Sequence, residues 1–162
     1  KALGEKAVCE SLDKYFLIRT AWLYGEGKNF VKTMLALSEK NKTLRVISDQ
    51  TGSPTSAAEL ARFIIYLIGT NKYGIWHGVC DGSTSWYEFT KEIMKLVGKT
   101  EVEVLPIKSE EYKTKAKRPH YSVLSNEKLH RETEFEIKSW QEALKEYLSY
   151  HKIQKKRRTD SE

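Results

Sequence analysis

Amphipathic helical segments alternate with short apolar segments along this chain, and the alternation limits the folds it can adopt. Helical spacing of apolar residues predicts helices over 3–12, 30–37, 56–68, 86–97 and 139–148, and short apolar runs predict buried strands over 15–18, 44–47, 73–80 and 102–107. Helices that alternate with strands favour an α/β fold in which at least the first strands pair in parallel.

Local signals mark the ends of several predicted helices. Ser85 with Glu88 and Ser139 with Glu142 have the spacing of a capping box. Gly69 suits the end of the third predicted helix. That helix is expected to turn five apolar side chains inward, namely Leu60, Phe63, Ile64, Leu67 and Ile68.

Size and composition exclude several classes of protein. With 162 residues, 40% of them hydrophobic and 11% aromatic, the chain can build a core, which a disordered tail or a collagen-like fibre cannot. The longest apolar run, 63–68, is far shorter than the roughly 20 residues that cross a bilayer, so we expect a soluble, cytoplasmic protein with no membrane partner. Cys9 and Cys80 lack any disulfide or zinc pattern and are expected to be buried or inert thiols.

A net charge of +6 raises the hypothesis of nucleic-acid binding. Half of this excess lies in residues 152–162, where five Lys or Arg face two Asp or Glu. Such a terminal run is expected to be solvated and disordered. Because the rest of the sequence offers no basic stripe interleaved with aromatic residues, we expect no nucleic-acid partner.

Two polar segments follow predicted strands, where open α/β sheets bind ligands. Arg19 and Trp22 follow the strand at 15–18, although Trp22 is equally suited to a core and Arg19 to a surface ion pair. Asp49 and Gln50 follow the strand at 44–47 and suit the edge of a base or sugar, while the Gly and Pro after them are explained by a turn.

A basic segment and the histidines complete the candidates. Arg118, fixed beside Pro119, suits a pyrophosphate, although a solvated basic loop explains Lys115 to Pro119 equally well. The four histidines have neither metal-site nor triad spacing, and no metal site is expected. The nine glycines form neither G-x-G-x-x-G nor a P-loop, so any nucleotide cofactor must find its phosphate cradle elsewhere.

In their order along the chain, these segments resemble the dTDP-4-dehydrorhamnose reductases, members of the extended short-chain dehydrogenase/reductase family. The resemblance runs from Lys1 to about Leu148. The motifs that carry it are I-R-T-x-W-x-Y-G, N-F, D-Q-x-G-S-P-T, S-W-Y-E-F and K-R-P-x-x-S-x-L.

The resemblance implies an α/β fold that comprises the last part of a Rossmann-like parallel sheet and a small mixed α/β C-terminal substrate-binding region. Residues 1–55 would hold the C-terminal part of the Rossmann-like domain, interleaved with substrate-domain segments. Residues 56–150 would supply the remaining helices and the substrate-binding region, and residues 151–162 a disordered basic tail.

In that family a Tyr-x-x-x-Lys pair performs the chemistry, and Lys1 of Lys1–Glu5 (K-x-x-G-E) matches its lysine. Lys1 is thereby predicted to be catalytic and to bind the cofactor, NADPH or NADH. The tyrosine would lie four residues earlier, outside this sequence, so this chain alone is expected to be inactive. The resemblance also implies a homodimer, and nothing in the sequence supports the Mg²⁺ found at some dimer contacts of the family.

The substrate residues implied by the resemblance lie further along the chain. Trp22 would meet the sugar, Asn29 and Phe30 the diphosphate, Arg118 the pyrophosphate and Gln50 the nucleotide. The implied reaction reduces dTDP-4-dehydro-L-rhamnose to dTDP-L-rhamnose with NADPH, for surface polysaccharide. The alternative is a non-catalytic sugar-nucleotide-binding or regulatory subunit of the same fold.

Overall fold

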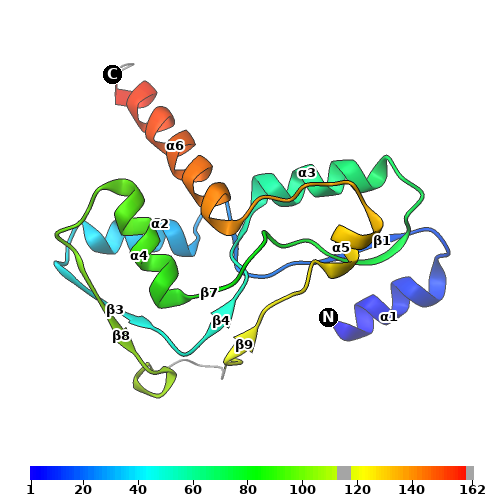
Figure 1. Ribbon diagram of the computed structural model, residues 1–162, viewed down its shortest axis with the longest axis horizontal. Helices are drawn as coiled ribbons and strands as arrows, with labels where there is room; N and C mark the ends of the chain where they lie inside the picture. Colours follow the sequence, from blue (N-terminus) through cyan, green and yellow to red (C-terminus); the bar gives the residue numbers. More distant parts are fainter. Residues whose placement is uncertain (113–117, 160–162) are drawn as a thin grey trace.

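The computed structural model describes residues 1–112 and 118–159, with side chains as far as residue 151. Its strands form small sheets that are mostly parallel, and helices pack against them, so the predicted α/β class is confirmed. Figure 1 shows an elongated arrangement in which two groups of elements lie at opposite ends of the view.

One group is built on a pair of parallel strands. Its elements are α1 (Ala2–Ser11), β1 (Phe16–Arg19), α3 (Ala57–Ile68), β6 (Gly74–His77) and α5 (Glu127–Glu132). Strand β1 pairs in parallel with β6. The side chain of Ser56 accepts a hydrogen bond from the Ala58 N–H (3.3 Å) and so begins α3. The buried cluster of this group contains Phe63, Leu67, Trp76, Leu129 and Ile137.

The other group surrounds a second parallel pair. It contains α2 (Phe30–Ser38), β3 (Thr43–Ile47), α4 (Trp86–Val97), β8 (Glu103–Ile107) and α6 (Trp140–Thr159). Strands β3 and β8 pair along their whole length, and α2, α4 and α6 supply most of the larger buried cluster. Helix α4 begins at Ser85, which accepts from the Glu88 N–H (3.1 Å), and ends at Gly98, whose φ of +78° favours glycine.

Very short strands connect the two groups and carry the segments singled out in the sequence. They are β2 (Leu23–Tyr24), β4 (Thr51–Gly52), β5 (Thr55–Ser56), β7 (Thr84–Ser85) and β9 (Tyr121–Ser122), with the 3₁₀ turn η1 at Ser109–Glu111. Strand β2 pairs with β5, and β4 lies between β7 and β9. The polar loops after β1 and β3 are thereby held against the segment that precedes β9.

One expectation about buried side chains is wrong. Ile64 and Ile68 are 38% and 64% exposed, because α3 packs through the side that carries Phe63 and Leu67. The backbone of residues 151–159 continues α6, since Lys, Arg and Gln are good helix formers and neither Gly nor Pro interrupts them. The disorder expected of the basic tail stays a prediction.

The predicted division of the chain at residue 55 stays a prediction, and residues 160–162 lie outside the described residues. Among the described residues, no helix is long and apolar enough to span a membrane.

Candidate functional site

The loop after β1 holds Trp22 in an unusual position. Its φ is +44°, a left-handed value that is strained for a residue other than glycine. Its half-buried indole stacks on that of Trp86, the first residue of α4, with ring centroids 3.4 Å apart and planes 5° from parallel. Trp86 also contacts Phe30, whose ring centroid is 4.3 Å away. Three half-buried rings therefore adjoin where α2, α4 and this loop meet.

The backbone of Gly52 lies against the same indole. A Cβ atom added at Gly52 would stand 2.3 Å from Cε2 of Trp22 and 2.6 and 2.7 Å from the bonded neighbours Nε1 and Cζ2. These distances place the added atom over the face of the ring rather than at its edge. Because Trp86 covers one face at stacking distance, Gly52 must lie on the other, and both faces of the Trp22 indole are occupied.

Gln50 is buried at 5% exposure directly before β4. Its Nε2 donates to Oγ of Ser109 (2.9 Å). The adjacent Asp49 accepts from the Ser109 hydroxyl at 2.7 Å and from its backbone N–H at 3.0 Å. Burial raises the pKa of Asp49, but these hydrogen bonds outweigh it and hold the pKa below its usual value. The pair thus has divided roles: Asp49 fastens η1 to the end of β3, and Gln50 lines the cavity beside it.

Arg118 is brought to this region by the pairing of β9, which begins three residues after it, with β4. Strand β9 runs parallel to β4, and the Thr51 N–H donates to the carbonyl of His120 (2.8 Å). The chain from Arg118 to Ser122 is thereby laid beside Gln50 and Trp22. The guanidinium is exposed. The residues before it, 113–117, including the rest of the predicted basic segment, lie outside the described residues.

Two adjacent pockets occupy the space between these side chains. The apolar pocket, of about 410 Å³, is lined by Phe30, Met34, Leu37, Arg45, Val46, Ile47, Gln50, Trp86, Tyr112 and Arg118. The indole pocket, of about 200 Å³, is lined by Ala21, Trp22, Gln50, Trp86, Arg118, Pro119 and Ser122. The two pockets share Gln50, Trp86 and Arg118. A ligand that spans both would meet an apolar ring at each end and a guanidinium between them.

The predicted site residues are therefore partly brought together. Trp22, Phe30, Gln50 and Arg118 line one or both pockets. Asn29 lines neither: it caps α2 by accepting from the Lys32 N–H, and its Nδ2 donates to the Gly25 carbonyl (2.7 Å).

Lys1 and Arg19 lie outside the two pockets. Lys1 is exposed at the start of α1. Arg19 forms an ion pair with Glu5 (2.5 Å), which is the structural role that the sequence left open for it.

Trp86 and Tyr112 line the candidate site but were not predicted from the sequence, and Trp86 lines both pockets. It lies in the S-W-Y-E-F motif, whose serine was read only as a helix cap. An aromatic residue at the first position of a helix equally suits a core, so its place between two pockets had no separate signal in the sequence.

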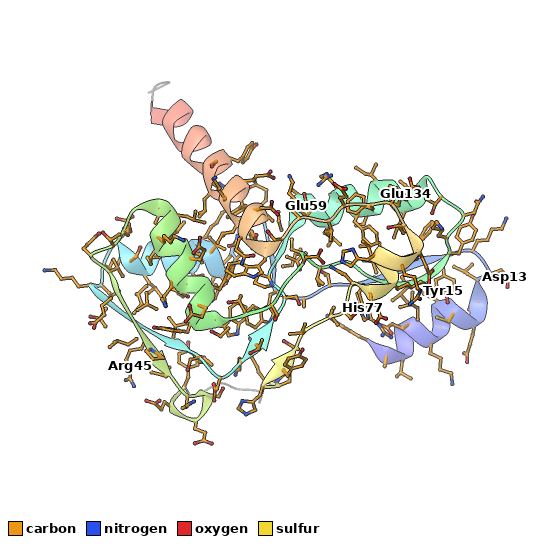
Figure 2. All side chains as sticks on the ribbon, viewed as in Figure 1. Asp13, Tyr15, Arg45, Glu59, His77 and Glu134 are labelled. Atoms are coloured by element: carbon orange, nitrogen blue, oxygen red, sulfur yellow. The ribbon has the colours of Figure 1, made fainter. Side chains whose placement is uncertain are left out.

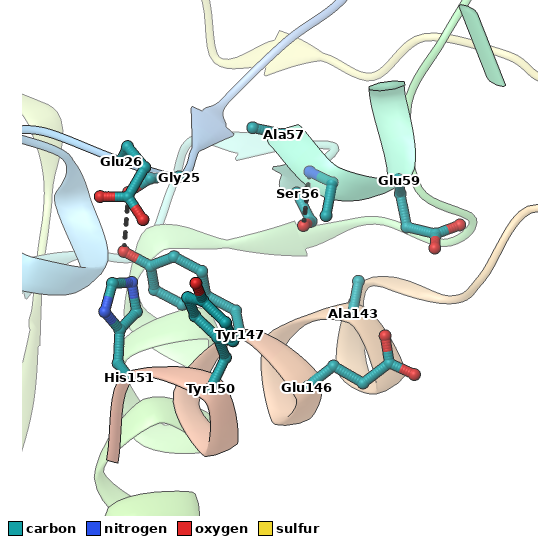
Figure 3. A pocket seen from close by; sticks show the side chains of 11 residues that line it. Gly25, Glu26, Ser56, Ala57, Glu59, Ala143, Glu146, Tyr147, Tyr150 and His151 are labelled. Atoms are coloured by element: carbon teal, nitrogen blue, oxygen red, sulfur yellow. Dashed lines mark hydrogen bonds between the residues drawn. The ribbon is translucent and has the colours of Figure 1, made fainter. Parts of the chain in front are cut away.

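A third pocket, of about 370 Å³, lies between the first turn of α3 and α6 (Figure 3). In it the Tyr147 hydroxyl donates to the Gly25 carbonyl (2.9 Å), and burial lowers the pKa of His151. None of the predicted site residues lines it. Within 1–112 and 118–159, the structure holds no cluster of three or more His, Cys, Asp or Glu side chains that suits a metal ion.

Comparison with known proteins gives one family. The model of the RmlD substrate binding domain matches residues 1–153. The spore coat polysaccharide biosynthesis protein SpsK of Bacillus subtilis is 44% identical over 149 residues, which cover 91% of this chain and 52% of that protein. The dTDP-4-dehydrorhamnose reductase of Escherichia coli is 35% identical over 92% of this chain and 54% of its own length. The chain thus spans about half the length of the curated relatives it matches.

Solved structures agree with these relatives. A dTDP-4-dehydrorhamnose reductase from Clostridium acetobutylicum is 45% identical with a TM-score of 0.90, and the match covers 94% of this chain and 54% of that one. A reductase of the same name from Bacillus anthracis, in complex with NADP, is 41% identical with a TM-score of 0.86, over 93% of this chain and 53% of that one.

Proposed function

This chain belongs to the family of the RmlD substrate binding domain, and on that basis we propose that it is the substrate-binding part of a dTDP-4-dehydrorhamnose reductase. The reaction would reduce dTDP-4-dehydro-L-rhamnose to dTDP-L-rhamnose with NADPH, in the cytoplasm, for a surface polysaccharide. In this proposal the elements up to residue 55 complete a Rossmann-like sheet, the elements of 56–150 form most of the substrate region, and the whole assembles as a homodimer.

The observation that carries the proposal is the convergence of Trp22, Gln50 and Arg118 on adjoining pockets from three separate segments. The planar guanidinium of Arg118 can bond two oxygens of a diphosphate at once. The apolar pocket, with Phe30 and Tyr112, suits a flat pyrimidine, and the indole pocket suits the apolar face of a deoxysugar. In a dTDP-sugar the diphosphate lies between the thymidine and the sugar, as Arg118 lies where the two pockets meet.

The chain's own residues bind and orient the substrate in this scheme. Gln50 and Arg118 would fix the diphosphate, and Asn29 would act indirectly by holding the start of α2 beside Phe30. A substrate that is held at its diphosphate and at its sugar presents the sugar carbonyl in one orientation. Correct orientation accounts for much of the rate in reactions of this kind.

This chain supplies only part of a binding site for the nicotinamide cofactor. NADPH supplies the hydride when bound, but the sequence contains no glycine-rich dinucleotide loop. The contact that we assign to this chain is Lys1, whose ammonium group would hold the nicotinamide ribose and lower the pKa of a neighbouring acid.

Calorimetric titration of the chain tests the proposal. We expect dTDP to bind and NADPH to bind far more weakly. The variant Arg118→Ala should weaken dTDP binding about tenfold or more, because a charge-assisted hydrogen-bonded pair contributes roughly 1.5–3 kcal/mol. Arg131→Ala is the matched control, since Arg131 is an exposed arginine that pairs with the adjacent Glu132. Unchanged dTDP affinity in Arg118→Ala would exclude this site.

A further inference from the structure

We propose that Trp86 is a specificity-determining residue of this site, because its indole covers the face of Trp22 that a sugar ring needs and a bound dTDP-sugar must displace it. This inference rests on the proposed function, which places the sugar in the indole pocket. It assigns to Trp86 a role separate from that of the diphosphate-binding Arg118.

Access to Trp22 is the first step of the argument. Gly52 lies over one face of its indole, where a Cβ atom would come within 2.3 Å of Cε2. The strained backbone of Trp22, with φ +44°, and the pairing of the adjacent β2 with β5 hold the residue in place. The Gly52 side therefore cannot open without moving β4. The Trp86 side is closed only by a side chain, so this is the face that a ligand can uncover.

The second step is the nature of the stack. Aromatic pairs prefer offset or edge-to-face geometry to full superposition. Trp22 and Trp86 are nearly superposed, with centroids 3.4 Å apart and planes 5° from parallel. A stack of this kind is displaced at smaller cost than an offset pair. A sugar C–H face that takes the place of Trp86 would meet an indole already held flat and rigid.

The third step is the contrast with the other two tryptophans. Trp76 is 1% exposed and its Nε1 donates to the Lys72 carbonyl (2.8 Å), and Trp140 is 7% exposed within the larger core. Trp22 and Trp86 are half-buried and border a pocket. Trp86 also lines both the indole pocket and the apolar pocket, as Gln50 and Arg118 do. Its movement therefore changes the shape of the cavity, whereas movement of Trp76 or Trp140 would disrupt a core.

The consequence is that the site distinguishes nucleotides by the sugar that they carry. A nucleoside diphosphate without a sugar can bind Arg118 while Trp86 remains stacked. A sugar nucleotide must replace the Trp22–Trp86 contact, so only a sugar with an apolar face regains the favourable contact energy that is lost when the two indoles separate. Removing the Trp86 indole should therefore favour dTDP-rhamnose relative to dTDP.

Affinity ratios measure this effect. The ratio of the dTDP dissociation constant to that of dTDP-L-rhamnose should rise about two- to tenfold in Trp86→Ala, the range expected for one aromatic pair, and less in Trp86→Phe. Because both ligands need Arg118 and a folded site, a loss of stability would lower both affinities and leave the ratio unchanged. In a Trp22→Ala background the Trp86 substitution should no longer change the ratio.

Fluorine NMR on the chain labelled with 5-fluorotryptophan gives a direct readout of the stack. Saturating dTDP-L-rhamnose should shift the resonances of Trp22 and Trp86, and dTDP alone should leave that of Trp22 in place. The resonances of Trp76 and Trp140 are internal controls. Binding of dTDP-L-rhamnose without a shift at Trp22, or an unaltered ratio in Trp86→Ala, overturns this inference and leaves the proposed function standing. If neither nucleotide binds, both fall.

Discussion

At the scale of single residues, the site depends on small side chains as much as on large ones. Trp22 can lie flat over β4 only because position 52 has no side chain. The requirement at this position is therefore steric: Gly52 has no positive φ, but the space beside it is already filled. The sequence motif that contains Gly52 is explained by this contact as well as by its turn.

Gly52→Ala should destabilise the fold by about 1–3 kcal/mol, the usual cost of overpacking. Its Cβ would overlap the Trp22 ring, so the substitution should also weaken the binding of dTDP-L-rhamnose more than the binding of dTDP. Gly4→Ala is the control: no atom lies within 4 Å of its added Cβ, and alanine favours a helix, so stability should stay equal or rise slightly. Urea unfolding curves measure both variants, and equal midpoints for Gly52→Ala and the parent chain would contradict the packing argument.

The two cysteines should differ sharply in reactivity. Cys9 is exposed on α1, whereas Cys80 is buried and its burial raises the pKa of the thiol to about 11. The thiolate is the reactive form, so at pH 8 the folded chain should react with a thiol reagent at Cys9 within minutes and at Cys80 only after denaturation. Mass spectrometry of the modified peptides identifies each site. Rapid modification of Cys80 in the folded chain would show that this core opens readily.

At the scale of secondary-structure elements, the sequence predicted helix starts well where the signal was local. The expected box at Ser139 is complete, because Ser139 accepts from the Glu142 N–H and the Glu142 carboxylate accepts from the Ser139 N–H (3.0 Å). Asn29, which is expected at the diphosphate, caps α2, and its amide also donates to the Tyr147 hydroxyl (3.0 Å) of α6. That contact spans most of the chain, which no local pattern reveals.

Ser139→Ala should lower the free energy of unfolding by about 0.5–2 kcal/mol, the usual cost of losing an N-cap. The Ser139 hydroxyl donates to the Glu142 carboxylate and accepts from the Glu142 N–H, and these hydrogen bonds stabilise the first turn of α6. Ser149→Ala, at an exposed position in the middle of the same helix, should leave stability within about 0.5 kcal/mol of the parent chain. Denaturant titration followed by circular dichroism compares the two, and equal effects would mean that the box does not stabilise α6.

At the scale of the whole molecule, two buried clusters share one chain, and polar side chains link them. Glu59, 2% exposed near the start of α3 (Figure 2), forms an ion pair with Arg62 (2.6 Å) and accepts from the Lys138 N–H just before α6. The alternation of helices and strands predicted the α/β class. It could not predict which elements share a core, because that depends on contacts between residues distant in sequence. For the same reason, the exposure of Ile64 and Ile68 was missed.

The site shows the same division between local and distant information. Trp22, Gln50 and Arg118, which line the candidate pockets, were predicted because each belongs to a recognisable motif. Trp86 was not found, because its role arises only where α4 begins beside the loop after β1. When the role of a residue depends on a neighbour from another element, the local spacing of residues in the sequence does not reveal it.

Acid unfolding tests how the polar links contribute to the stability of the whole molecule. Hydrogen bonds from Ser109 hold the pKa of Asp49 below its usual value despite burial, so the carboxylate is favoured in the folded state. A group with a lowered folded pKa stabilises the fold above its unfolded pKa, and this contribution disappears as pH falls through the folded value. The free energy of unfolding should therefore decline below about pH 4, close to the unfolded pKa of an aspartate.

Asp49→Asn should flatten that decline and lower stability at pH 7, and Ser109→Ala should do both more weakly, because the backbone N–H of Ser109 remains as a donor. Urea unfolding at a series of pH values between 2 and 7, followed by tryptophan fluorescence, measures the curves. The two variants change the same hydrogen bonds from opposite ends, so their effects should be less than additive in the double variant. Fully additive effects, or a variant curve parallel to that of the parent chain, would assign the acid sensitivity to other carboxylates, such as Glu142, whose pKa is lowered by the Ser139 hydroxyl.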